Sequence, residues 1–432
     1  MIKTVSLRTL GCRLNHSESD AVQDELQKFG WQIVSQNIPA DVTVINSCAV
    51  THQAEAKTRG AIAAARRISP QGKIMVVGCY AQLAAQELLN QAGVTLVLGN
   101  KEKYHIPEYL KELEQGKSGI FMTNGDQGYT FPLDGIIARG DRLRAHLKIQ
   151  DGCDYHCAYC IIPLLRGRAR SRNFVQILNE ARMLSELGFQ EIVLTGVNIG
   201  TYSTDVCKDL ATLVESLLAK TSIKRIRLSS IEPDLITDRL IDLMAHESRF
   251  CRHFHIPLQH GAGPILKRMQ RRYTTKMYHE LVARIADSVP DVCIGTDVMV
   301  GFPGETESHF QTMLRLIKRL PLTYLHVFRF SARPGTAAAN LSNPVPEYLK
   351  KERVTQLRDL GKSLKKCFLK SFIGRELIVL FEKKNELGLF EGLSDNYITV
   401  RVSSSQLLIN QMRQIRINGV SGVIALGEVV DE

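Results

Sequence analysis

Residues 153–160 of the chain read Cys153-Asp-Tyr-His-Cys157-Ala-Tyr-Cys160, and they directly follow the strand-like stretch Arg144-Ala-His-Leu-Lys-Ile-Gln150. Three thiolates on so short a loop can hold three irons of a four-iron, four-sulfur cluster. A cluster closed by the protein alone needs four cysteines, and an electron-transfer protein normally supplies the fourth. This Cys-x₃-Cys-x₂-Cys loop therefore predicts a cluster whose fourth iron is left for another ligand.

The composition is that of a globular protein. A chain of 432 residues is long enough for two or three domains. No stretch of the sequence approaches the ~20 continuous apolar residues of a membrane helix, and the N-terminus Met1-Ile-Lys-Thr-Val-Ser-Leu7 predicts a strand, not a signal peptide. Cysteine clusters in a reducing compartment bind metals more often than they form disulfides. We therefore expect a cytoplasmic protein without membrane attachment.

The net charge of +11 is unevenly distributed along the chain. Residues 1–135 balance at zero and residues 371–432 at −2, whereas residues 136–370 carry an excess of 13 positive charges. Scattered surface lysines are usually only solvated, but a clustered excess favours a polyanionic partner. Two basic groups stand out within the excess: Arg166, Arg168, Arg170 and Arg172, and Lys267, Arg268, Arg271 and Arg272.

Three regions with different patterns divide the chain into predicted domains 1–135, 136–370 and 371–432. In the first, short strands (3–9, 42–46, 73–77, 95–98) alternate with helices (17–29, 54–68, 81–91), which predicts a small parallel α/β sheet. Residues 116–135 contain many turn-forming residues and predict a connector.

The second region repeats the alternation on a larger scale. Its strand candidates are 146–149, 191–194, 226–228, 253–257, 291–299 and 324–330, with helices such as 175–187 and 276–286 between them. We predict a partial (βα)₆ barrel with its chemistry at the carboxyl ends of the strands. After a basic helix at 347–370, short alternating strands at 376–381, 397–402, 414–417 and 423–430 predict a small all-β barrel.

Three further cysteines, Cys12, Cys48 and Cys79, each follow a predicted strand of the first region. The carboxyl ends of parallel strands converge on one edge of a sheet, where ligand sites form. A single free cysteine is usually a small buried hydrophobe. Three in the same structural position instead predict a second cluster with an open iron. The remaining cysteines share no spacing and are expected to be ordinary residues: Cys207, Cys251, Cys293 and Cys367.

The order of these motifs resembles the radical S-adenosylmethionine (SAM) methylthiotransferases over essentially the whole chain. The resemblance rests on a Leu-Gly-Cys-x-x-Asn opening, an Asn-x-Cys second site, a Gly-Cys third site, the loop with Tyr159 before its last cysteine, and a terminal β-barrel similar to the TRAM domain. Segments 168–172, 194–198, 229–233, 255–261, 267–269 and 297–306 also fit. It implies a radical SAM enzyme with SAM and two [4Fe–4S] clusters as cofactors.

The opening motif bears on the substrate. Thr9-Leu-Gly-Cys-Arg-Leu-Asn15 and Asn46-Ser-Cys-Ala-Val-Thr51 are most similar to the branch that methylthiolates C2 of N6-threonylcarbamoyladenosine beside the anticodon of tRNA. The isopentenyladenosine branch usually opens with Tyr-Gly-Cys-x-Met-Asn, and the branch that modifies a ribosomal-protein aspartate with Leu-Gly-Cys-Pro-Lys-Asn. Arg13-Leu14 matches neither, although His16-Ser17 stands where the first branch commonly has Gln-Tyr.

The resemblance also assigns cofactor residues. Cys153, Cys157 and Cys160 would hold the cluster that binds SAM, and Cys12, Cys48 and Cys79 would hold the cluster that carries the methylthio group. Tyr159 would lie beside the adenine of SAM and Gly196 beside its methionine part, with packing and chain reversal as their structural alternatives. Ser230 and Glu232 would hold the ribose or amino group, although Glu232 can equally be a helix N-terminal charge. No side chain is singled out as catalytic.

Several basic residues are candidates for RNA contacts. We expect Lys267, Arg268, Arg271 and Arg272 to contact phosphates, although such a helix face is often only solvated. Arg329 and Arg333 are candidates for the threonyl carboxylate, with ion pairs that close the barrel as the alternative. The acidic terminal barrel would bind through its shape and exposed side chains, such as Tyr397, Arg401, Arg413 and Arg416. The polar groups expected on the cavity wall are His255, Gln259 and His260.

Two other functions stay open at this point. The same chemistry could act on isopentenyladenosine in tRNA or on a ribosomal-protein aspartate. A different class is a non-catalytic iron–sulfur protein that binds RNA and senses redox state. A sensor needs one cluster and no SAM cavity, so two cysteine triplets favour the enzyme. We expect a monomer with tRNA as its partner, and an electron donor and a sulfur source that the sequence does not identify.

Overall fold

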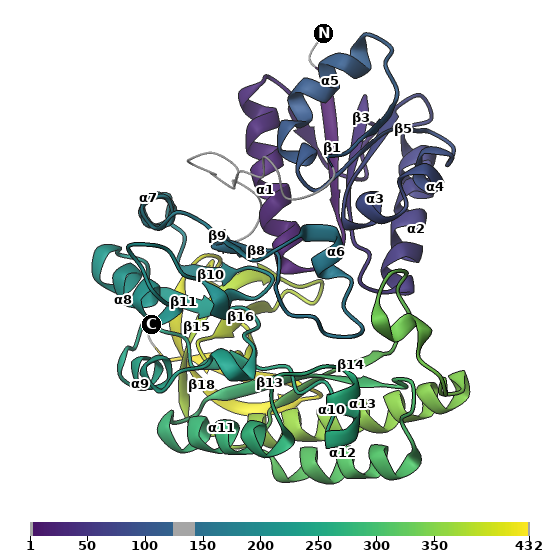
Figure 1. The fold of residues 1–432 in the computed structure, drawn as a ribbon. Coiled ribbons are helices and arrows are strands. Elements are labelled where there is room, and N and C mark those ends of the chain that lie inside the picture. The colour runs from purple at the N-terminus through teal and green to yellow at the C-terminus, as the bar shows by residue number, and fades with distance from the viewer. Residues whose placement is uncertain (1–2, 124–142, 431–432) are drawn as a thin grey trace.

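The computed structural model describes residues 3–123 and 143–430 and confirms the predicted α/β architecture with a terminal β-barrel (Figure 1). The N-terminal domain contains a parallel sheet in the order β2-β1-β3-β4-β5-β6. Its strands are β1 (Thr4–Thr9), β2 (Gln32–Val34), β3 (Val42–Ser47), β4 (Lys73–Gly78), β5 (Val94–Leu98) and β6 (Gly119–Phe121). Every residue of β3 is buried, as expected for a parallel strand that helices cover on both faces.

The helices of this domain are α1 (Arg13–Lys28), α2 (His52–Ile68), α3 (Cys79–Leu83), α4 (Ala85–Leu89), η1 (Glu102–His105) and α5 (Ile106–Glu114). The helix predicted at 81–91 is in fact two short helices that meet at Ala84. The predicted connector contains strand β6, and its part from residue 124 onward lies outside the described residues, as does the predicted boundary after residue 135. Strands as short as β2 and β6 carry too few residues to show a periodic pattern.

The central domain is a partial barrel of parallel strands in the order β7-β10-β11-β12-β13-β14. The strands are β7 (Arg144–Lys148), β10 (Glu191–Thr195), β11 (Arg225–Leu228), β12 (His253–His255), β13 (Cys293–Val300) and β14 (Tyr324–Arg329). All six predicted strands are present. Isolated bridges, including Ser230 with His255, join the two halves of the sheet. Within the described residues no pairing links β7 to β14, so the barrel is open on that side.

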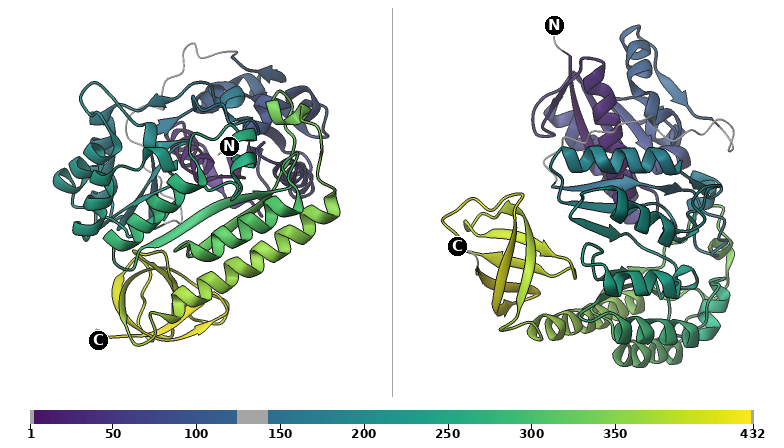
Figure 2. Two further views of the ribbon diagram at one scale, coloured as in Figure 1. Left: turned by 60° about the horizontal axis from the view of Figure 1, so that its bottom comes forward. Right: turned by 90° about the vertical axis from the view of Figure 1, so that its left-hand side faces the viewer.

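Helices cover the outside of the central barrel and enclose a large apolar core. They are α6 (Ile162–Arg166), α7 (Phe174–Glu186), η2 (Ile199–Thr201), α8 (Leu210–Lys220), η3 (Pro233–Leu235), α9 (Asp238–His246), α10 (Gly263–Arg268), α11 (Thr275–Ser288), α12 (Glu307–Arg319), η4 (Ala337–Asn340) and α13 (Glu347–Lys370). A short ribbon of β8 (Gln150–Asp151) and β9 (Arg170–Ser171) flanks the three-cysteine loop. Helix α13 packs along β14 and leads to the terminal barrel (Figure 2).

The terminal domain is a closed barrel in the order β15-β16-β17-β19-β18, as predicted. Its strands are β15 (Glu376–Lys384), β16 (Phe390–Ser394), β17 (Thr399–Val402), β18 (Met412–Ser421) and β19 (Ile424–Val429). Strand β16 was not predicted, because Gly392 interrupts its apolar pattern. A Cβ at Gly392 would lie 2.5 Å from the carbonyl oxygen of Leu380, so the glycine permits the close approach of the neighbouring strand.

Buried arginines join the terminal barrel to the central one. Arg225 donates to the carbonyl of Leu393 (2.9 Å), and Arg227 donates to the carbonyls of Ser394 (3.0 Å) and Asp395 (2.8 Å). These contacts place the β16–β17 turn at the end of the central barrel. Across the described part of the chain, no helix combines the length and the apolar composition that crossing a membrane requires.

Candidate active site

The carboxyl ends of β1, β3 and β4 bring Cys12, Cys48 and Cys79 to one edge of the N-terminal sheet. Cys12 precedes α1, Cys48 follows β3, and Cys79 begins α3. Burial first, and then the nearby thiols of Cys79 and Cys12, raise the pKa of Cys48 to about 12. All ten cysteines are free of disulfides. Burial also raises the pKa of Cys12. Three adjacent thiols at one edge of the sheet fit a metal centre, because metals bind the thiolate.

The backbone at this edge is tightly packed. Gly11 has φ +103°, and a Cβ there would lie 2.7 Å from Cβ and 2.9 Å from Sγ of Cys48. The Asn15 amide ties the first two cysteine loops together, since it donates to the carbonyls of Leu10 (2.7 Å) and Ser47 (3.0 Å). The positions of the thiols are therefore fixed by contacts between strands that lie far apart in the sequence.

The Cys153–Cys160 loop follows β8 and is held at both ends. Gly152 has φ +70°, and a Cβ there would lie 1.9 Å from the carbonyl oxygen of Arg168, so only glycine fits. The Cys153 N–H donates to the carbonyl of Gly167 (3.1 Å), and the Ala158 N–H donates to that of Met269 (3.0 Å). Burial is also the largest influence on Cys160, whose pKa is raised to about 12.

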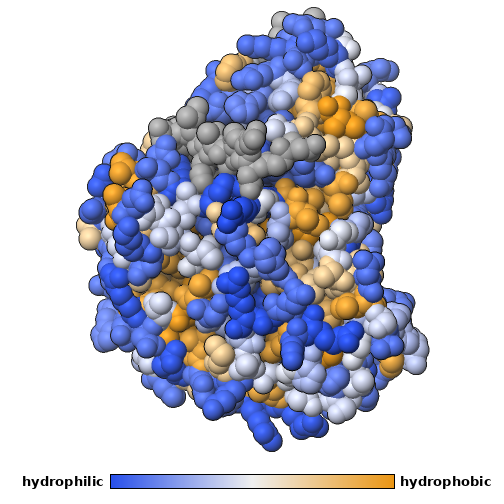
Figure 3. Space-filling view, viewed as in Figure 1, coloured by the Kyte–Doolittle hydropathy of each residue, from blue (hydrophilic) through white to orange (hydrophobic). Residues whose placement is uncertain are grey.

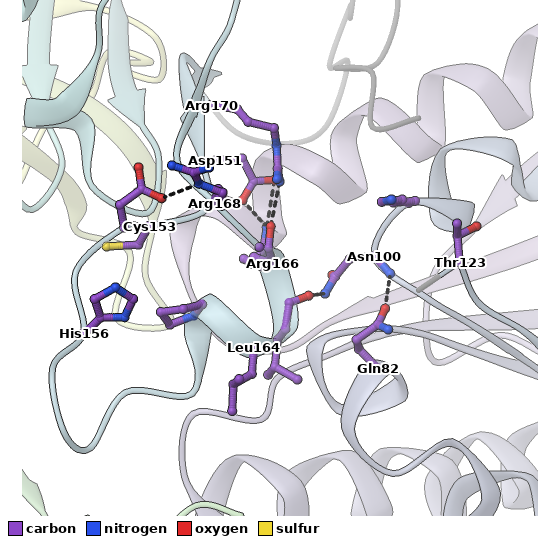
Figure 4. Close-up of a pocket in the computed structure, with 15 residues that line it drawn as sticks. Gln82, Asn100, Thr123, Asp151, Cys153, His156, Leu164, Arg166, Arg168 and Arg170 are labelled. Atoms are coloured by element: carbon purple, nitrogen blue, oxygen red, sulfur yellow. Dashed lines mark hydrogen bonds and ion pairs between the residues drawn. The ribbon is translucent and has the colours of Figure 1, made fainter. Parts of the chain in front are cut away.

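The two cysteine triplets flank one apolar cluster. Ile161 and Leu165, which follow the second triplet, pack with Cys79 and Tyr80 in the core of the N-terminal domain. A cavity of about 620 Å³ borders this contact, and Figure 4 shows Gln82 and Asn100 on one side of it and Cys153 and Arg166 on the other. Figure 3 shows apolar residues on the surface where the N-terminal and central domains meet. Packing between α3 and α6 thus brings the two predicted cluster sites close to each other.

Arg271 organises the polar side of the second triplet. It donates to Cys157 Sγ (3.0 Å) and to the hydroxyl of Tyr159 (3.2 Å), and it forms an ion pair with Glu232. Only 2% of its side chain is exposed and its charge is paired with Glu232, whereas the sequence predicted a contact with RNA phosphate. Arg271 lies after the end of α10 and not on the helix face assumed from the sequence. Burial raises the pKa of Glu232 even though Arg271 opposes it, and Glu232 makes no helix-capping hydrogen bond.

A buried amide lies beside Cys153. The side chain of Asn198 is buried, and within the described structure its amide has no partner other than the nearby thiol of Cys153. The backbone N–H groups of Val197 (3.0 Å) and Asn198 (2.8 Å) donate to the side-chain oxygen Oε1 of Gln150, and these hydrogen bonds fix the loop. A Cβ at Gly196 would lie 2.9 Å from Oε1 of Gln150. Because a buried amide with unmet hydrogen bonds is costly, this loop fits a polar ligand such as SAM.

A cluster of buried charges joins the N-terminal and central domains. Glu18 accepts from Lys103 (2.5 Å), Lys148 (2.9 Å) and Arg166 (2.7 Å), and its side chain is 0% exposed. Burial alone would raise the pKa of Glu18, but the cations, Arg166 foremost, hold it well below its usual range. Arg166 also donates to Asn15 (3.0 Å), which connects these charges to the first cysteine site.

Half of the first basic group is therefore not on the surface. Arg166 belongs to the buried charges, and Arg172 is 2% exposed and forms an ion pair with Glu180 (2.5 Å). By contrast, Arg168 is 83% exposed. Arg166 ends helix α6 and Arg170 begins strand β9, while Arg168 and Arg172 lie outside both elements, so only the fold decides which of these side chains water reaches.

Polar residues line the interior of the central barrel. Alternate residues of β13 pack into the outer core, so Asp297 faces inward. Nε2 of His255 lies 3.3 Å and Nδ1 of His326 lies 3.4 Å from Oδ1 of Asp297. Burial alone would raise the pKa of Asp297, but the two imidazoles hold it well below its usual range. Ser230, a predicted SAM contact, lies 2.6 Å from Nδ1 of His255. Two imidazoles and a carboxylate also form a possible donor set for a divalent metal.

The other expected wall residues behave differently. Gln259 pairs with β13 through its backbone N–H, which donates to the carbonyl of Asp297 (2.8 Å). His260 is wholly buried with Nε2 3.7 Å from Glu305, so the prediction that it lines the cavity is wrong.

Comparisons with known proteins agree with this geometry. Residues 4–99 match the family described as "Uncharacterized protein family UPF0004", and residues 147–317 match the "Radical SAM superfamily". The chain is 36% identical to threonylcarbamoyladenosine tRNA methylthiotransferase MtaB of Bacillus subtilis over 96% of this chain and 93% of that protein. It is 35% identical to the protein of the same name from Thermotoga maritima, over 98% of this chain and 97% of that protein. The chain belongs to the radical SAM methylthiotransferase family.

A second group of relatives lies within the same family. The chain is 32% identical to tRNA-2-methylthio-N6-dimethylallyladenosine synthase of Alkaliphilus oremlandii over 100% of this chain and 93% of that protein. This radical SAM methylthiotransferase therefore has SAM and [4Fe–4S] clusters as its cofactors.

Solved structures share the fold with this methylthiotransferase. The radical SAM methyltransferase TsrM of Kitasatospora setae, with cobalamin and a [4Fe–4S] cluster bound, matches with a TM-score of 0.57 at 14% identity, over 78% of this chain and 74% of that one. The cobalamin-dependent enzyme OxsB matches with a TM-score of 0.51 at 12% identity, over 83% of this chain and 56% of that one. At such low identity these likenesses concern the fold alone.

Several residues expected to contact RNA in this methylthiotransferase are committed to other contacts. Arg333 is 2% exposed, pairs with Glu55 and contacts Nδ1 of His52 (3.1 Å), which matches the ion-pair alternative expected from the sequence. Arg329 is exposed but forms an ion pair with Glu347, which is the alternative expected from the sequence. Lys267, Arg268 and Arg272 are exposed, as an RNA contact requires.

The terminal barrel shows a similar division. Tyr397 was expected on an outer surface, but its ring stacks on His253 inside the seam between the barrels, with the ring centres 4.1 Å apart. Arg401 pairs with Glu391 (2.8 Å) and Arg416 with Glu376 (2.8 Å), while Arg413 donates to the carbonyl of Met412. These arginines are partly neutralised, in keeping with the negative charge of this domain.

Proposed function

We propose that this chain transfers a methylthio group to C2 of N6-threonylcarbamoyladenosine beside the anticodon of tRNA. The observation that carries the proposal is the position of two cysteine triplets on either side of one apolar cluster. The substrate is favoured by the opening Thr9–Asn15 motif and by identity, which is 35–36% to three proteins named for this substrate and 31–32% to the dimethylallyladenosine synthases.

The chain's residues suit distinct roles in that reaction. We infer that one cluster is held by Cys153, Cys157 and Cys160, and the other by Cys12, Cys48 and Cys79. Reductive cleavage of SAM to a radical and delivery of the methylthio group are the chemistry that the two clusters supply when bound. Arg271 fixes Tyr159 and Glu232 around Cys157, and Asn198 presents its buried amide to the ligand. The apolar packing around Ile161 and Leu165 excludes water between the two sites.

The substrate is tested with purified tRNA that bears either the threonylcarbamoyl or the isopentenyl group. We expect methylthiolated product from the first alone, measured by nucleoside mass spectrometry after anaerobic reaction with SAM and a reductant. Product confined to the isopentenyl form contradicts the substrate and leaves the enzyme class intact. The same analysis of tRNA from cells that lack the protein identifies the natural substrate directly.

The division of labour between the clusters has its own test. Anaerobic reconstitution should give about eight irons per chain, as expected for two four-iron clusters. Alanine at Cys153, Cys157 and Cys160 should remove about half of the iron and abolish deoxyadenosine formation. Alanine at Cys12, Cys48 and Cys79 should also remove about half, but deoxyadenosine should still form without methylthio product. Wild-type protein that never exceeds four irons, or forms no deoxyadenosine, favours the redox-sensor alternative.

We infer further that the protein acts in the cytoplasm as a monomer on tRNA and receives electrons from a separate donor. The tRNA-modifying relatives support the location and the partner. Sedimentation of the protein with and without tRNA tests the oligomeric state.

A further inference from the structure

An arginine next to the first cysteine site faces the seam between the barrels. Arg13 directly follows Cys12 in the first turn of α1. Its Nη2 donates to the hydroxyl of Tyr397 (2.8 Å), and its guanidinium carbon lies 5.8 Å from the centre of that ring. Its charge, after burial and Arg227, lowers the pKa of His253 on β12. Arg13 therefore reaches from the N-terminal domain to a point where all three domains meet.

This guanidinium lacks a counter-ion. Among residues 3–123 and 143–430, no carboxylate forms an ion pair with Arg13, whose contact with Tyr397 is to a neutral group. The other arginines nearby are neutralised: Arg227 by Glu191, Arg271 by Glu232 and Arg333 by Glu55. A partly buried cation without an anion gains more from an anionic ligand than an exposed, paired one, because less water competes.

A path leads from the surface to this position. A groove of about 800 Å³ at the open side of the barrel is lined by Tyr324, His326 and Tyr397. Its rim on α13 carries the cations Arg358, Lys362 and Lys365. The acidic residues in the lining are paired, Glu382 with Arg144 (2.5 Å) and Glu391 with Arg401 (2.8 Å). The groove therefore suits a polyanion that carries one further anionic group toward Tyr397.

We propose that Arg13 binds the threonyl carboxylate of the modified adenosine and so selects this substrate over a dimethylallyl one. The inference rests on the proposed function. In the proposed reaction, C2 of the adenine must approach the cluster held by Cys12 and its two partner cysteines. The threonylcarbamoyl group on N6 projects past the same base edge as C2, so its carboxylate comes within reach of the side chain next to Cys12. An uncharged dimethylallyl group leaves the guanidinium without an anion and gains nothing from it.

The size of the expected effect follows from the type of contact. Hydrogen bonds to charged groups contribute enough to change an equilibrium by roughly 10- to 100-fold. Neutralising the carboxylate or removing the arginine should each produce this loss. Making both changes together should weaken binding little more than either change alone, because each removes the same contact.

The test measures binding of anticodon stem-loop RNAs that bear the free threonyl acid or its methyl ester to the cluster-loaded protein. Wild type should bind the acid about 10- to 100-fold more tightly than the ester. Arg13→Gln should bind both equally, and Arg13→Lys should recover part of the preference. Arg329→Gln removes the same charge from a side chain that Glu347 already neutralises, so it should keep the full ratio.

The outcomes separate the inference from the function on which it rests. Iron content and deoxyadenosine formation show that each variant is folded and loaded. A variant Arg13→Gln that keeps the wild-type preference for the acid overturns the inference, while methylthiolation of the threonylcarbamoyl RNA by wild type leaves the function standing. Wild type that acts only on dimethylallyl RNA overturns both. Loss of the ratio in Arg13→Gln, with its retention in Arg329→Gln, supports the inference.

Discussion

The buried charges at the interface of the N-terminal and central domains allow a quantitative prediction. The substitution Glu18→Gln keeps the size of the side chain but removes the carboxylate that three cations share, at 2.5 Å (Lys103), 2.9 Å (Lys148) and 2.7 Å (Arg166). Asp151 then remains as a carboxylate partner of Lys148 and Arg166. All of these side chains are at most 3% exposed, so water cannot replace the lost charge.

The magnitude follows from the geometry. At an effective dielectric constant of about 20, each contact contributes roughly 6 kcal/mol of gross Coulomb attraction. The desolvation of the Glu18 carboxylate offsets most of it, and removal of one partner from a buried ionic group typically costs about 3–5 kcal/mol net. For a cooperative unit of about 150–250 residues this corresponds to a fall in unfolding temperature on the order of 10 °C.

Calorimetry of the cluster-loaded protein tests this value. The control is Glu25→Gln on the same helix: the Glu25 side chain is 37% exposed, and its Oε1 lies 2.8 Å from Nζ of Lys28. An exposed pair of this kind contributes less than about 1 kcal/mol, so the control should unfold within a few degrees of wild type. If Glu18→Gln unfolds at the same temperature as Glu25→Gln, the buried charges do not stabilise the interface and the reasoning fails.

Three further predictions concern other sites. Gly11→Ala should lower the iron content by about half, because the new Cβ would displace Cys48 and the alanine would be held at a strained positive φ. An iron content equal to that of wild type would contradict this prediction. Arg227→Gln removes the nearest cation of the buried Glu191 carboxylate and leaves only the more distant Arg144 (3.8 Å) and Arg225 (4.0 Å). It should cost about 3–5 kcal/mol, measured as a fall in unfolding temperature that the exposed control Arg239→Gln does not share. Arg227 also holds the pKa of Glu191 at about 2, below its ordinary value of 4.5. The stability that this shift provides, roughly 3 kcal/mol, is therefore complete above about pH 4.5 and lost as the pH falls toward 2. The difference in unfolding temperature between wild type and Glu191→Gln should narrow over that range, and a constant difference would show that the carboxylate is not responsible.

The elements that the sequence predicted are those whose signal is local. All six strands of the central barrel alternate with helices long enough to show a periodic apolar pattern, and they were placed within a few residues. The positions of both cysteine triplets relative to their strands were predicted for the same reason. Strands β2 and β6 were missed because each is a three-residue edge strand with a single neighbour, and β16 was missed because Gly392 interrupts its apolar pattern.

The ion-pair partners of charged side chains could not be predicted from the neighbouring sequence. Arg271, Arg333 and Arg166 stand in basic stretches that resemble phosphate-binding groups, yet each is buried against a carboxylate from another element. Arg329 and Arg333 were predicted to bind the threonyl carboxylate, whereas Arg13, in a different domain, is an arginine that forms no ion pair with any described residue. A sequence lists charges without saying which of them neutralise one another.

The sequence by itself thus indicated the order of α/β and all-β regions, the two cysteine sets and the class of reaction. Strand–helix periodicity and cysteine spacing each involve only residues that are close together in the chain. Only the tertiary structure decided that the two sets share one apolar cluster and that Tyr397 of the terminal barrel meets Arg13 of the N-terminal domain. Burial and pairing depend on which surfaces exclude water together, and residues separated by hundreds of positions contribute to each such surface.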